Sequence, residues 1–528
     1  MRQWMVAAKK ADFYAIAEKF HVDPVVARII RNREVIGEKN IRIYLGGNLS
    51  DLSDPHQMKD MDRLVEILAQ KIRKQVHIRI IGDYDVDGVT SSHLFLTALR
   101  RVGAKVDVVI PHRIQDGYGL SLHLLQQAKE DGVDTILTCD NGIAAIDEIA
   151  WAKAQKMTVL VTDHHAVPFE EHEGRRTEKK SLADAVVNPH QQDCGYPYKE
   201  LCGAGVAWNV IRVLYENYDM DKREAEDLLD FVAMATVCDV MSLTGENRIL
   251  VKEGLKRIRH TKNIGLQALM QACNVQPENI SAYHFGYVLG PCVNATGRLD
   301  TARHALRLFE TGQETEAEEI ARDLVDLNQE RKELTLQGVE MAKKLCEEGG
   351  YENDPVLVLF LPDVHESIAG LIAGRIREMY NRPVFVLTRG EEGVKGSGRS
   401  TENYSMYENM CGCAELFTKF GGHPMAAGLS LPEENVEKFR RKINENCPLT
   451  VEEVCPDIHI DMAMPVGYAS TELVHQFALL EPFGKDNPSP LFADRNLSIS
   501  RMWVIGKNRN VLRMSVLSEY GQPVPVIF

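Results

Sequence analysis

The stretch Val76–Gly88 reads VHIRIIGDYDVDG, and its two parts differ in character. Residues 76–81 are apolar and rich in β-branched side chains, which predicts a short buried strand. The strand ends at Gly82 and Asp83, where aspartates begin to alternate with other residues. Residues 89–101 then have the pattern of a helix. The stretch therefore predicts a strand, an acidic loop and a helix in direct succession.

The same order of strand and helix continues along the chain. Further strands are expected at residues 105–111, 134–139, 157–162 and 183–187, and helices at residues 120–130 and 144–155. Repeated strand–helix units imply a mostly parallel sheet covered by helices, with right-handed crossovers. The fold class expected is therefore α/β.

The rest of the chain is helical at first and mixed later. Residues 305–348 predict a long exposed helix that links two domains. Strands at residues 355–360 and 383–387 flank a helix at residues 367–380, which indicates a second α/β unit. The domains expected are an N-terminal helical segment (1–70), a parallel-sheet domain (71–300), a connecting helix (301–348), a smaller α/β domain (349–450) and a β-rich region (451–528).

Composition limits the classes of protein that fit. The 528 residues carry a formal net charge of −15, so bulk positive charge does not hold nucleic acid to this chain. Metal ions can still supply positive charge where a phosphate binds. The eleven cysteines form no CxxC pair, and a zinc site at Cys411 and Cys413 would need two more ligands nearby. A cytoplasmic protein without membrane segments is expected, because no apolar run approaches the roughly 18 residues that span a bilayer.

Acidic and histidine side chains follow three of the expected strands. They are the cluster at residues 83–88, Asp140-Asn141-Gly142 and Asp163-His164-His165. The carboxyl ends of parallel strands share one edge of a sheet, so these clusters are expected to converge. So many carboxylates cannot all stay ionised side by side without a positive counter-charge. A site that combines carboxylates and imidazoles suits Mn²⁺ or Mg²⁺.

A further aspartate lies in the apolar helical run 231–240. Asp239 is costly there unless it is paired or bound to metal. Each cluster also has a simpler interpretation: a solvated or calcium-binding loop at residues 83–88, a hydrogen-bonded histidine at His164, or a helix-end aspartate at Asp239. Their order and their common edge favour a site for two divalent cations, with Asp85 and Asp87 placed to contact one ion each.

These motifs resemble the four ordered motifs of the DHH phosphoesterase superfamily. The DYDVDG form is typical of its RecJ branch of single-strand-specific 5′→3′ DNA exonucleases, and the resemblance runs from about residue 51 to about residue 492. It implies five metal ligands: Asp85, Asp87, Asp140, His164 and Asp239. It also places His165 beside the metals and the substrate phosphate. Asp83 and Asp163 are implied to support these groups, and Asp83 could act more directly.

The second α/β unit resembles the DHH-associated domain, DHHA1. The resemblance rests on residues 364–370, 396–400 and 421–428. Small residues let a phosphate backbone approach closely, or they simply form tight turns. Four side chains are expected to bind substrate here: Ser397, Arg399, Ser400 and His423. By resemblance, Arg113 and Arg298 also contact phosphate, and Tyr118 either stacks a base or packs within its loop.

The function implied is hydrolysis of single-stranded DNA from its 5′ end to 5′-mononucleotides, in repair and recombination. The alternatives are a phosphodiesterase for short oligoribonucleotides or dinucleotides, and a non-catalytic Cdc45-like replication scaffold. The scaffold interpretation is disfavoured because all four motifs are present. The expected partners are single-stranded DNA and a helicase or single-strand-binding protein, and the chain is expected to be a monomer.

The C-terminal region resembles the OB domain of RecJ proteins. Residues 481–492 resemble the junction into it, and three strands are expected at residues 497–505, 511–517 and 524–528. An OB barrel needs five strands. Unless earlier segments such as residues 457–462 complete it, we expect either a fragment of a longer protein or a barrel with an open edge. With an open edge, the chain is expected to grip long single strands less well than a complete chain. The basic residues that remain in this region to bind the strand would be Lys485, Lys507 and Arg509.

Overall fold

The computed structural model describes residues 4–113, 116–117, 119–172, 175–351, 353–390, 393–450, 458–506 and 509–528. The chain forms two compact units. The larger unit contains residues 6–325 and 460–528, and the smaller unit contains residues 326–459 with the N-terminal strand residues Trp4 and Met5. Among the described residues, no helix is long and apolar enough to cross a membrane.

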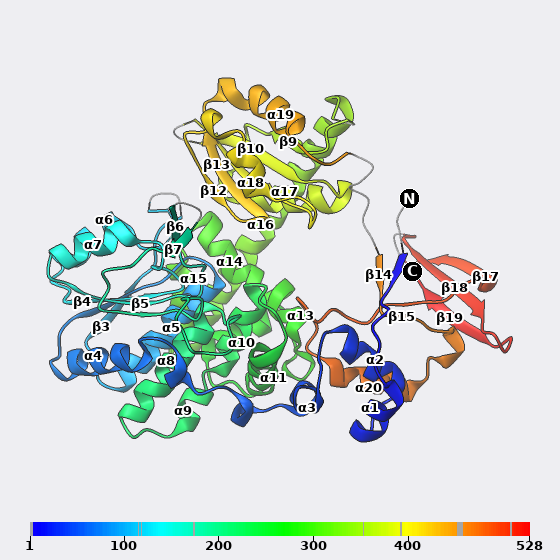
Figure 1. The fold of residues 1–528 in the computed structure, drawn as a ribbon, viewed down its shortest axis with the longest axis horizontal. Coiled ribbons are helices and arrows are strands. Elements are labelled where there is room, and N and C mark those ends of the chain that lie inside the picture. The colour runs from blue at the N-terminus through cyan, green and yellow to red at the C-terminus, as the bar shows by residue number, and fades with distance from the viewer. Residues whose placement is uncertain are drawn as a thin grey trace. The chain divides into compact units, whose positions relative to one another are not determined.

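A five-stranded parallel sheet organises the larger unit, in the order β3-β2-β4-β5-β8 (Figure 1). Its strands are β2 (Ile78–Ile81), β3 (Val106–Val109), β4 (Thr135–Cys139), β5 (Thr158–Thr162) and β8 (Ala185–Val187). The sheet confirms the α/β expectation, because every strand pair is parallel. A short hairpin, β6 (Phe169–His172) and β7 (Arg175–Glu178), was not expected.

Helices cover both faces of this sheet, as Figure 1 shows. On one face, α4 (Met61–Arg73), α5 (Val86–Arg101) and α8 (Gly203–Asn217) form the main core. On the other face, α6 (Leu122–Glu130) and α7 (Ile146–Ala154) form a second core. The alternation of side chains along each strand supplies both cores, so that Ile80 faces the first and Ile81 the second.

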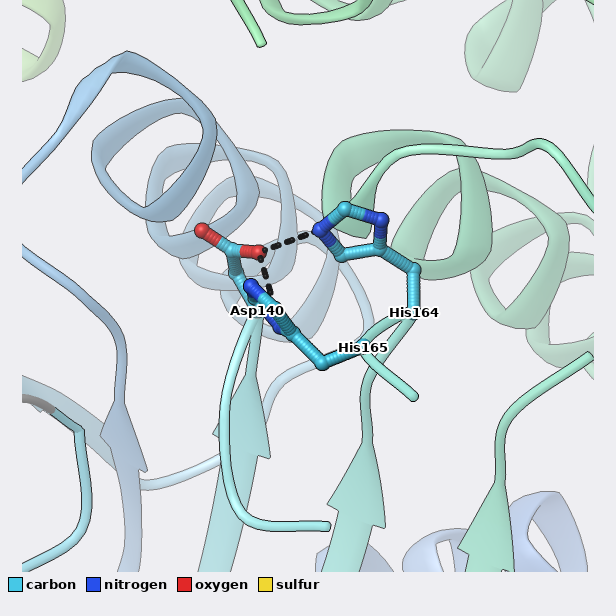
Figure 2. A group of neighbouring side chains, drawn as sticks. All are labelled: Asp140, His164 and His165. Carbon is cyan, nitrogen blue, oxygen red and sulfur yellow. Dashed lines mark ion pairs between the residues drawn. The ribbon is translucent and has the colours of Figure 1, made fainter. Parts of the chain in front are cut away.

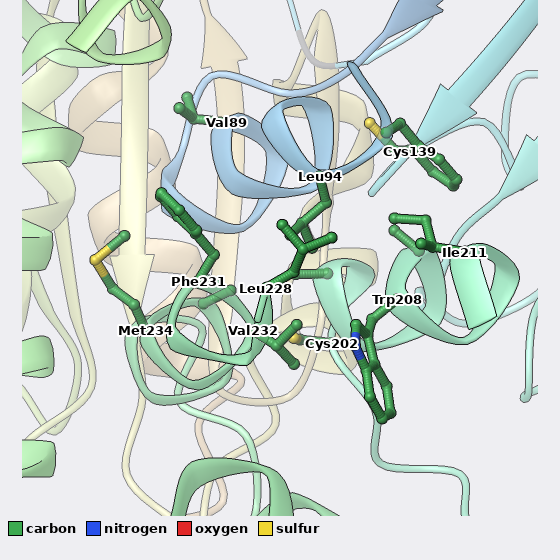
Figure 3. Packing of buried hydrophobic residues seen from close by; sticks show 14 of the residues in the cluster. Val89, Leu94, Cys139, Cys202, Trp208, Ile211, Leu228, Phe231, Val232 and Met234 are labelled. Carbon is green, nitrogen blue, oxygen red and sulfur yellow. The ribbon is translucent and has the colours of Figure 1, made fainter. Parts of the chain in front are cut away.

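Helix α10 (Leu229–Cys238) lies buried against α5 and α11 (Gly245–Ile258). Figure 3 shows Phe231 and Val232 of α10 in the same packing as Trp208 of α8 and Leu94 of α5. Burial all round this helix explains its almost uniformly apolar sequence. The helix ends at Asp239, which is its C-cap residue.

A buried carboxyl near the start of α10 makes stability depend on pH. Asp230 accepts hydrogen bonds from Thr261 Oγ1 at 2.6 Å and from the Phe231 amide at 2.8 Å. Burial raises the pKa of Asp230 from 3.8 to about 6. Because the folded chain binds this proton more tightly than the unfolded chain, the protonated Asp230 carboxyl stabilises the folded state. This stabilisation is fully present below the unfolded pKa. It is lost as the pH rises through the folded pKa.

We expect Asp230→Asn to remove this loss. The variant should gain up to about 3 kcal/mol over the wild type near neutral pH and nothing near pH ~4. Melting temperatures of both proteins at these two pH values measure the effect. A difference between variant and wild type that does not change with pH would contradict it.

A buried arginine joins three distant parts of the larger unit. Arg248 of α11 donates from Nε to the Tyr44 carbonyl at 2.8 Å, from Nη1 to Leu480 at 2.9 Å and from Nη2 to Leu479 at 2.8 Å. Its guanidinium carbon lies 3.9 Å from the centre of the Tyr44 ring. Helix α3 (Glu38–Gly46) and the turn Ala478–Leu480 are thereby fastened to α11.

The C-terminal strands form a small antiparallel sheet. Strands β17 (Ser498–Ile505), β18 (Val511–Leu517) and β19 (Pro523–Ile527) pair by hairpins, as expected. A separate parallel pair, β15 (Met462–Ala463) with β16 (Phe492–Ala493), lies earlier in the region. Within the described residues these strands do not form a closed five-stranded barrel.

The smaller unit holds a mixed sheet in the order β12-β13-β11-β10-β9. Its elements are β9 (Leu357–Phe360), α17 (Glu366–Tyr380), β10 (Val384–Gly390), β11 (Gly393–Arg399), α18 (Met406–Cys411), β12 (Lys419–Gly422), β13 (Ala426–Leu431) and α19 (Val436–Glu445). The expected strands and helix are present. The stretch 396–400 is largely strand rather than turn, because β11 pairs with both β10 and β13. The long helix α16 (Glu314–Glu348) leads from the larger unit into this one.

Candidate metal centre

The acidic loop after β2 is shorter than expected, and α5 begins inside the DYDVDG motif. Asp85 is the N-cap residue, and its Oδ1 accepts a hydrogen bond from the Gly88 amide at 3.1 Å. Asp87 therefore lies in the first turn of α5 rather than in a loop. A helical turn fixes the direction of this carboxylate more firmly than a loop does.

Backbone amides of another helix hold the Asp87 carboxylate. Its Oδ2 accepts from the Gly203 amide at 2.6 Å and its Oδ1 from the Ala204 amide at 2.7 Å, at the amino end of α8. The amino end of a helix carries partial positive charge and unpaired amides, so it favours a carboxylate. A side chain at Gly203 would begin only 2.7 Å from Asp140 Cβ, so glycine also lets α8 approach the second aspartate.

Asp140 follows β4 and is locked to the neighbouring strands. Its backbone has a φ of 62°, the left-handed conformation. The next residue, Asn141, donates from its side-chain nitrogen Nδ2 to the Ile81 carbonyl at 3.0 Å and to the Cys139 carbonyl at 2.9 Å. These bonds tie the ends of β2 and β4 together, and so the two acidic clusters stay at one edge.

Asp163 organises the histidine motif after β5. Its Oδ1 accepts from the His164 amide at 2.7 Å and lies 2.8 Å from His165 Nδ1, while its Oδ2 accepts from the Ile143 amide at 2.9 Å. Although burial opposes ionisation, the bonds from His165 lower the pKa of Asp163. Burial likewise opposes a charged imidazole, but Asp163 raises the pKa of His165 to about 9. The pair therefore favours a carboxylate beside an imidazolium.

The motifs meet at the edge of the sheet, as expected. His164 Nε2 lies 3.1 Å from Asp140 Oδ1 and 3.6 Å from both Asp87 Oδ2 and Asp239 Oδ2. His165 Nδ1 lies 4.0 Å from Asp140 Oδ1, and Figure 2 shows both imidazoles directed at this carboxylate. Ligand atoms of Asp83, Asp85 and Asp140 also lie within 4.8 Å of one another.

The carboxylates of this cluster repel one another. Burial and then the charges of Asp87 and Asp85 raise the pKa of Asp140 well above its ordinary value, and burial followed by the same two charges does so for Asp239. Burial and Asp87 raise the pKa of Asp85, and burial and Asp85 raise that of Asp83. Ionisation of the whole set therefore needs positive charge from outside the protein.

The donor atoms fit hard divalent cations. Asp83 Oδ2 is buried without a hydrogen-bond donor among the described residues. The nearest thiols do not compete, because burial raises the pKa of Cys139 to about 12 and raises that of Cys202 well above its ordinary value. Carboxylate oxygens and neutral imidazole nitrogens remain, which suits Mn²⁺ or Mg²⁺ better than a thiolate metal.

Two of the expected phosphate-binding arginines lie near this edge. The Arg113 guanidinium carbon lies 4.8 Å from the centre of the Tyr84 ring. Arg298, on α14 (Gly290–Leu299), follows Gly297, where an added side chain would begin 2.3 Å from the Tyr84 carbonyl oxygen. Asn294 of the same helix accepts from the Val86 amide at 3.1 Å. Tyr118 and Lys507 lie outside the described residues.

Four of the expected substrate-binding residues belong to the smaller unit. Arg399 of β11 donates to the Gly398 carbonyl at 2.7 Å and to Ser397 Oγ at 3.3 Å. Ser400 differs from expectation: it is buried and its hydroxyl donates to the Tyr404 carbonyl at 2.5 Å, so that hydroxyl is already engaged. His423 is exposed.

Three residues that shape the site were not singled out in the sequence: Gly203, Ala204 and Asn294. Asn141 was quoted as part of its motif, but no role was given to it. The Gly203–Ala204 stretch carries a further signal, since small residues begin the apolar helix α8. The others act through hydrogen bonds between segments far apart in the chain.

Comparison with known proteins agrees with this architecture. The model of the DHH family, N-terminal domain, matches residues 77–236, and that of the DHHA1 domain matches residues 353–447. The fold and the site thus define a protein of the DHH class. The model of the RecJ OB domain matches residues 460–528.

Relatives narrow the class further. The chain is 34% identical over 518 residues to the single-stranded-DNA-specific exonuclease RecJ of Haemophilus influenzae, which covers 94% of this chain and 88% of that protein. It is 33% identical over 512 residues to the protein of the same name from Bacillus subtilis, with 96% of this chain covered. The chain belongs to the RecJ family. It spans 63% of the Bacillus relative, less than two thirds of that protein's length.

Solved structures show the same fold. RecJ from Thermus thermophilus in complex with Mn²⁺ has a TM-score of 0.82 at 26% identity, covering 99% of this chain and 78% of that one. An exonuclease RecJ bound to manganese has a TM-score of 0.63 at 32% identity, covering 74% of this chain and 94% of that one.

Proposed function

We propose that this chain is a metal-dependent exonuclease that hydrolyses single-stranded DNA from the 5′ end to 5′-mononucleotides in repair and recombination. One observation carries the proposal: the buried cluster of carboxylates and imidazoles at the sheet edge, whose ionisation requires cations. The names of the RecJ relatives and the metals in their structures support it. The oligonucleotide phosphodiesterase and the Cdc45-like scaffold are less supported.

Two divalent cations, Mn²⁺ or Mg²⁺, are the proposed cofactors. The residues that would hold them are Asp85, Asp87, Asp140, His164 and Asp239. When bound, such ions supply a hydroxide at neutral pH and positive charge for the phosphate in the transition state. Asp83 is placed to support this set through its contact with the loop at Gly119, whose amide donates to its Oδ1 at 3.4 Å.

The protein's own groups bind and orient the phosphate in this proposal. Asp163 fixes the His165 ring in place, and the imidazolium adds positive charge at the metal edge. Arg113 and Arg298 add guanidinium groups near Tyr84, and Ser397, Arg399 and His423 of the smaller unit are proposed to bind the strand. The amides at the amino end of α8 keep Asp87 from moving during the reaction, so no reorganisation is needed there.

Oligonucleotides labelled at one end test the proposal. With Mn²⁺, we expect a 5′-labelled single strand to release labelled mononucleotide at once, and a 3′-labelled strand to shorten progressively. A blunt duplex of the same sequence should react at least about tenfold more slowly, because unpairing bases costs free energy. Equal rates on blunt duplex and single strand, or release from the 3′ end first, would contradict the proposal. A control in chelator should show no hydrolysis.

We further propose a cytoplasmic monomer that receives its substrate from a helicase or a single-strand-binding protein. An enzyme that needs a single-stranded end depends on another protein to expose one. Light scattering on the purified chain tests the monomer. Stimulation by a helicase on duplex DNA with a blunt end tests the partnership.

A further inference from the structure

A cavity of about 680 Å³ lies in the larger unit beside the end of helix α10. Its walls come from Val237 and Cys238 at that end, from the helical segment that contains Tyr283 and Tyr287, and from the junction at residues 481–489. Cys238 directly precedes Asp239 of the metal centre. The cavity therefore adjoins the proposed catalytic site.

Two tyrosines present their rings at this cavity. Tyr283 is 63% exposed and Tyr287 is 71% exposed, and their rings are stacked with centres 5.1 Å apart and planes 25° apart. Tyr283 lies on α13 (Ala282–His284), and Tyr287 lies in the π-helical turn Phe285–Leu289 that follows. Exposed aromatic rings held together in this way are characteristic of a binding surface, and π-helical turns are frequent at functional sites.

The tyrosine pair is held firmly against α10. Cys238 Sγ donates to the Phe285 carbonyl at 3.3 Å. A side chain at Gly290 would begin 2.3 Å from that sulfur, so glycine is needed for this close approach. The helix that ends at Asp239 and the helical segment that carries the rings are therefore packed directly against each other.

Positive charge lines the same cavity. Arg259 and Lys485 are both lining residues, and among the described residues neither forms an ion pair with a carboxylate. The backbone of Lys485 is held in place, because its carbonyl accepts a hydrogen bond from the Leu243 amide at 3.0 Å. Glu481 is the carboxylate that lines the cavity among the described residues.

We propose that this cavity is a base-stacking subsite for the single strand that is being hydrolysed. Tyr283 and Tyr287 take a base, and Arg259 and Lys485 contact the phosphates on either side of it. Stacked aromatic rings with cations beside them match the alternating bases and phosphates of a single strand. The inference rests on the proposed function, since continuity with Asp239 makes the same strand the occupant of both sites.

An abasic scan of binding tests the subsite directly. The probe is a fluorescent single strand of about 12 nucleotides, bound by the full chain in chelator so that no hydrolysis occurs, with one abasic position moved along it. In the wild type, we expect one or two positions where the missing base weakens binding about tenfold. The Tyr283→Ala/Tyr287→Ala variant should bind the intact strand about tenfold more weakly and lose that position dependence.

Two controls separate stacking from other causes. Tyr283→Phe/Tyr287→Phe keeps the rings and should retain the position dependence. Tyr14→Ala removes a tyrosine that is 78% exposed elsewhere in the larger unit and should change nothing. Melting temperatures should be unchanged in all variants because the altered side chains are exposed.

Hydrolysis with Mn²⁺ separates this inference from the proposed function. The double alanine variant should lose about tenfold in kcat/KM on the long strand and nothing on a dinucleotide, which is too short to reach the subsite.

If the wild type hydrolyses both substrates but the abasic penalty is the same in wild type and variant, the subsite is wrong and the proposed function stands. If the wild type hydrolyses neither, the proposed function fails, while the binding scan still decides the subsite. Unchanged strand binding with loss of binding to an aromatic peptide would assign the surface to a protein partner and overturn the inference.

Discussion

Asp140→Asn is expected to lower kcat by about a thousandfold or more and to raise the melting temperature of the metal-free chain. Asparagine has nearly the same shape as aspartate, so the close approach of Gly203 is preserved. The substitution removes one negative charge from a buried cluster in which Asp85, Asp87 and Asp239 all oppose ionisation of Asp140. Loss of activity and gain of stability then have one cause, because the same charge binds the cations and repels its neighbours.

Melting in chelator and in excess Mn²⁺ measures both effects. The wild type should be stabilised strongly by Mn²⁺, since a ligand that binds only the folded state shifts the equilibrium, and the variant should be stabilised much less. Asp219→Asn is the matched control, because Asp219 is exposed and also has a left-handed backbone. Turnover near that of the wild type, or a lower melting temperature in chelator, would show that Asp140 is not part of a cation site.

Arg248→Ala is expected to cost about 3 kcal/mol of stability in the larger unit. Arg248 is only 1% exposed, and its three donors satisfy the carbonyls of Tyr44, Leu479 and Leu480. Alanine would leave these carbonyls without donors and open a cavity under the Tyr44 ring. The attachment of residues 460–492 should weaken most, because two of the three carbonyls belong to it.

Chemical unfolding and limited proteolysis measure this effect. Arg212→Ala is the matched control: Arg212 also lies over an aromatic ring, 4.9 Å from the centre of Trp208, but it is only half-buried and donates to one side chain, Asn209. The control should cost less than about 1 kcal/mol. A loss of the same small size in Arg248→Ala, with no new cleavage before residue 460, would contradict the role given to this arginine.

The candidate metal centre was predictable because one rule of sheet geometry brings its motifs together. The carboxyl ends of parallel strands share an edge, so the residues after β2, β4 and β5 had to meet once the strands were identified. Asp239 was predictable for another reason, since a carboxylate is costly at the end of a buried helix. Neither inference needed the packing of side chains.

The parts that were not predicted depend on packing between distant segments. Asp87 receives its amide donors from α8, 116 residues further on in the chain, and nothing local indicates that partner. The start of α5 at Val86 was also missed, because an alternating acidic stretch is more typical of a loop than of a helix. In the smaller unit, the glycines of residues 396–398 suggested turns, but they lie in a strand with neighbours on both sides. Ser400 was expected to be accessible, and only the fold shows its hydroxyl turned inward.

The path of the chain has a consequence for biosynthesis. The larger unit is interrupted after Val325 and resumes at Ile460, so the ribosome makes the whole of the smaller unit before the larger one is complete. Every proposed ligand, from Asp85 to Asp239, emerges early, whereas Leu479 and Leu480 emerge only after the smaller unit. Domains generally fold as units during translation, so a nascent chain that ends near residue 459 holds a finished smaller unit beside a larger unit whose Arg248 still lacks two acceptors. Lys485 and the rest of the cavity wall at residues 481–489 arrive with the same late segment, so the proposed strand-binding cavity is completed only after the smaller unit has been made.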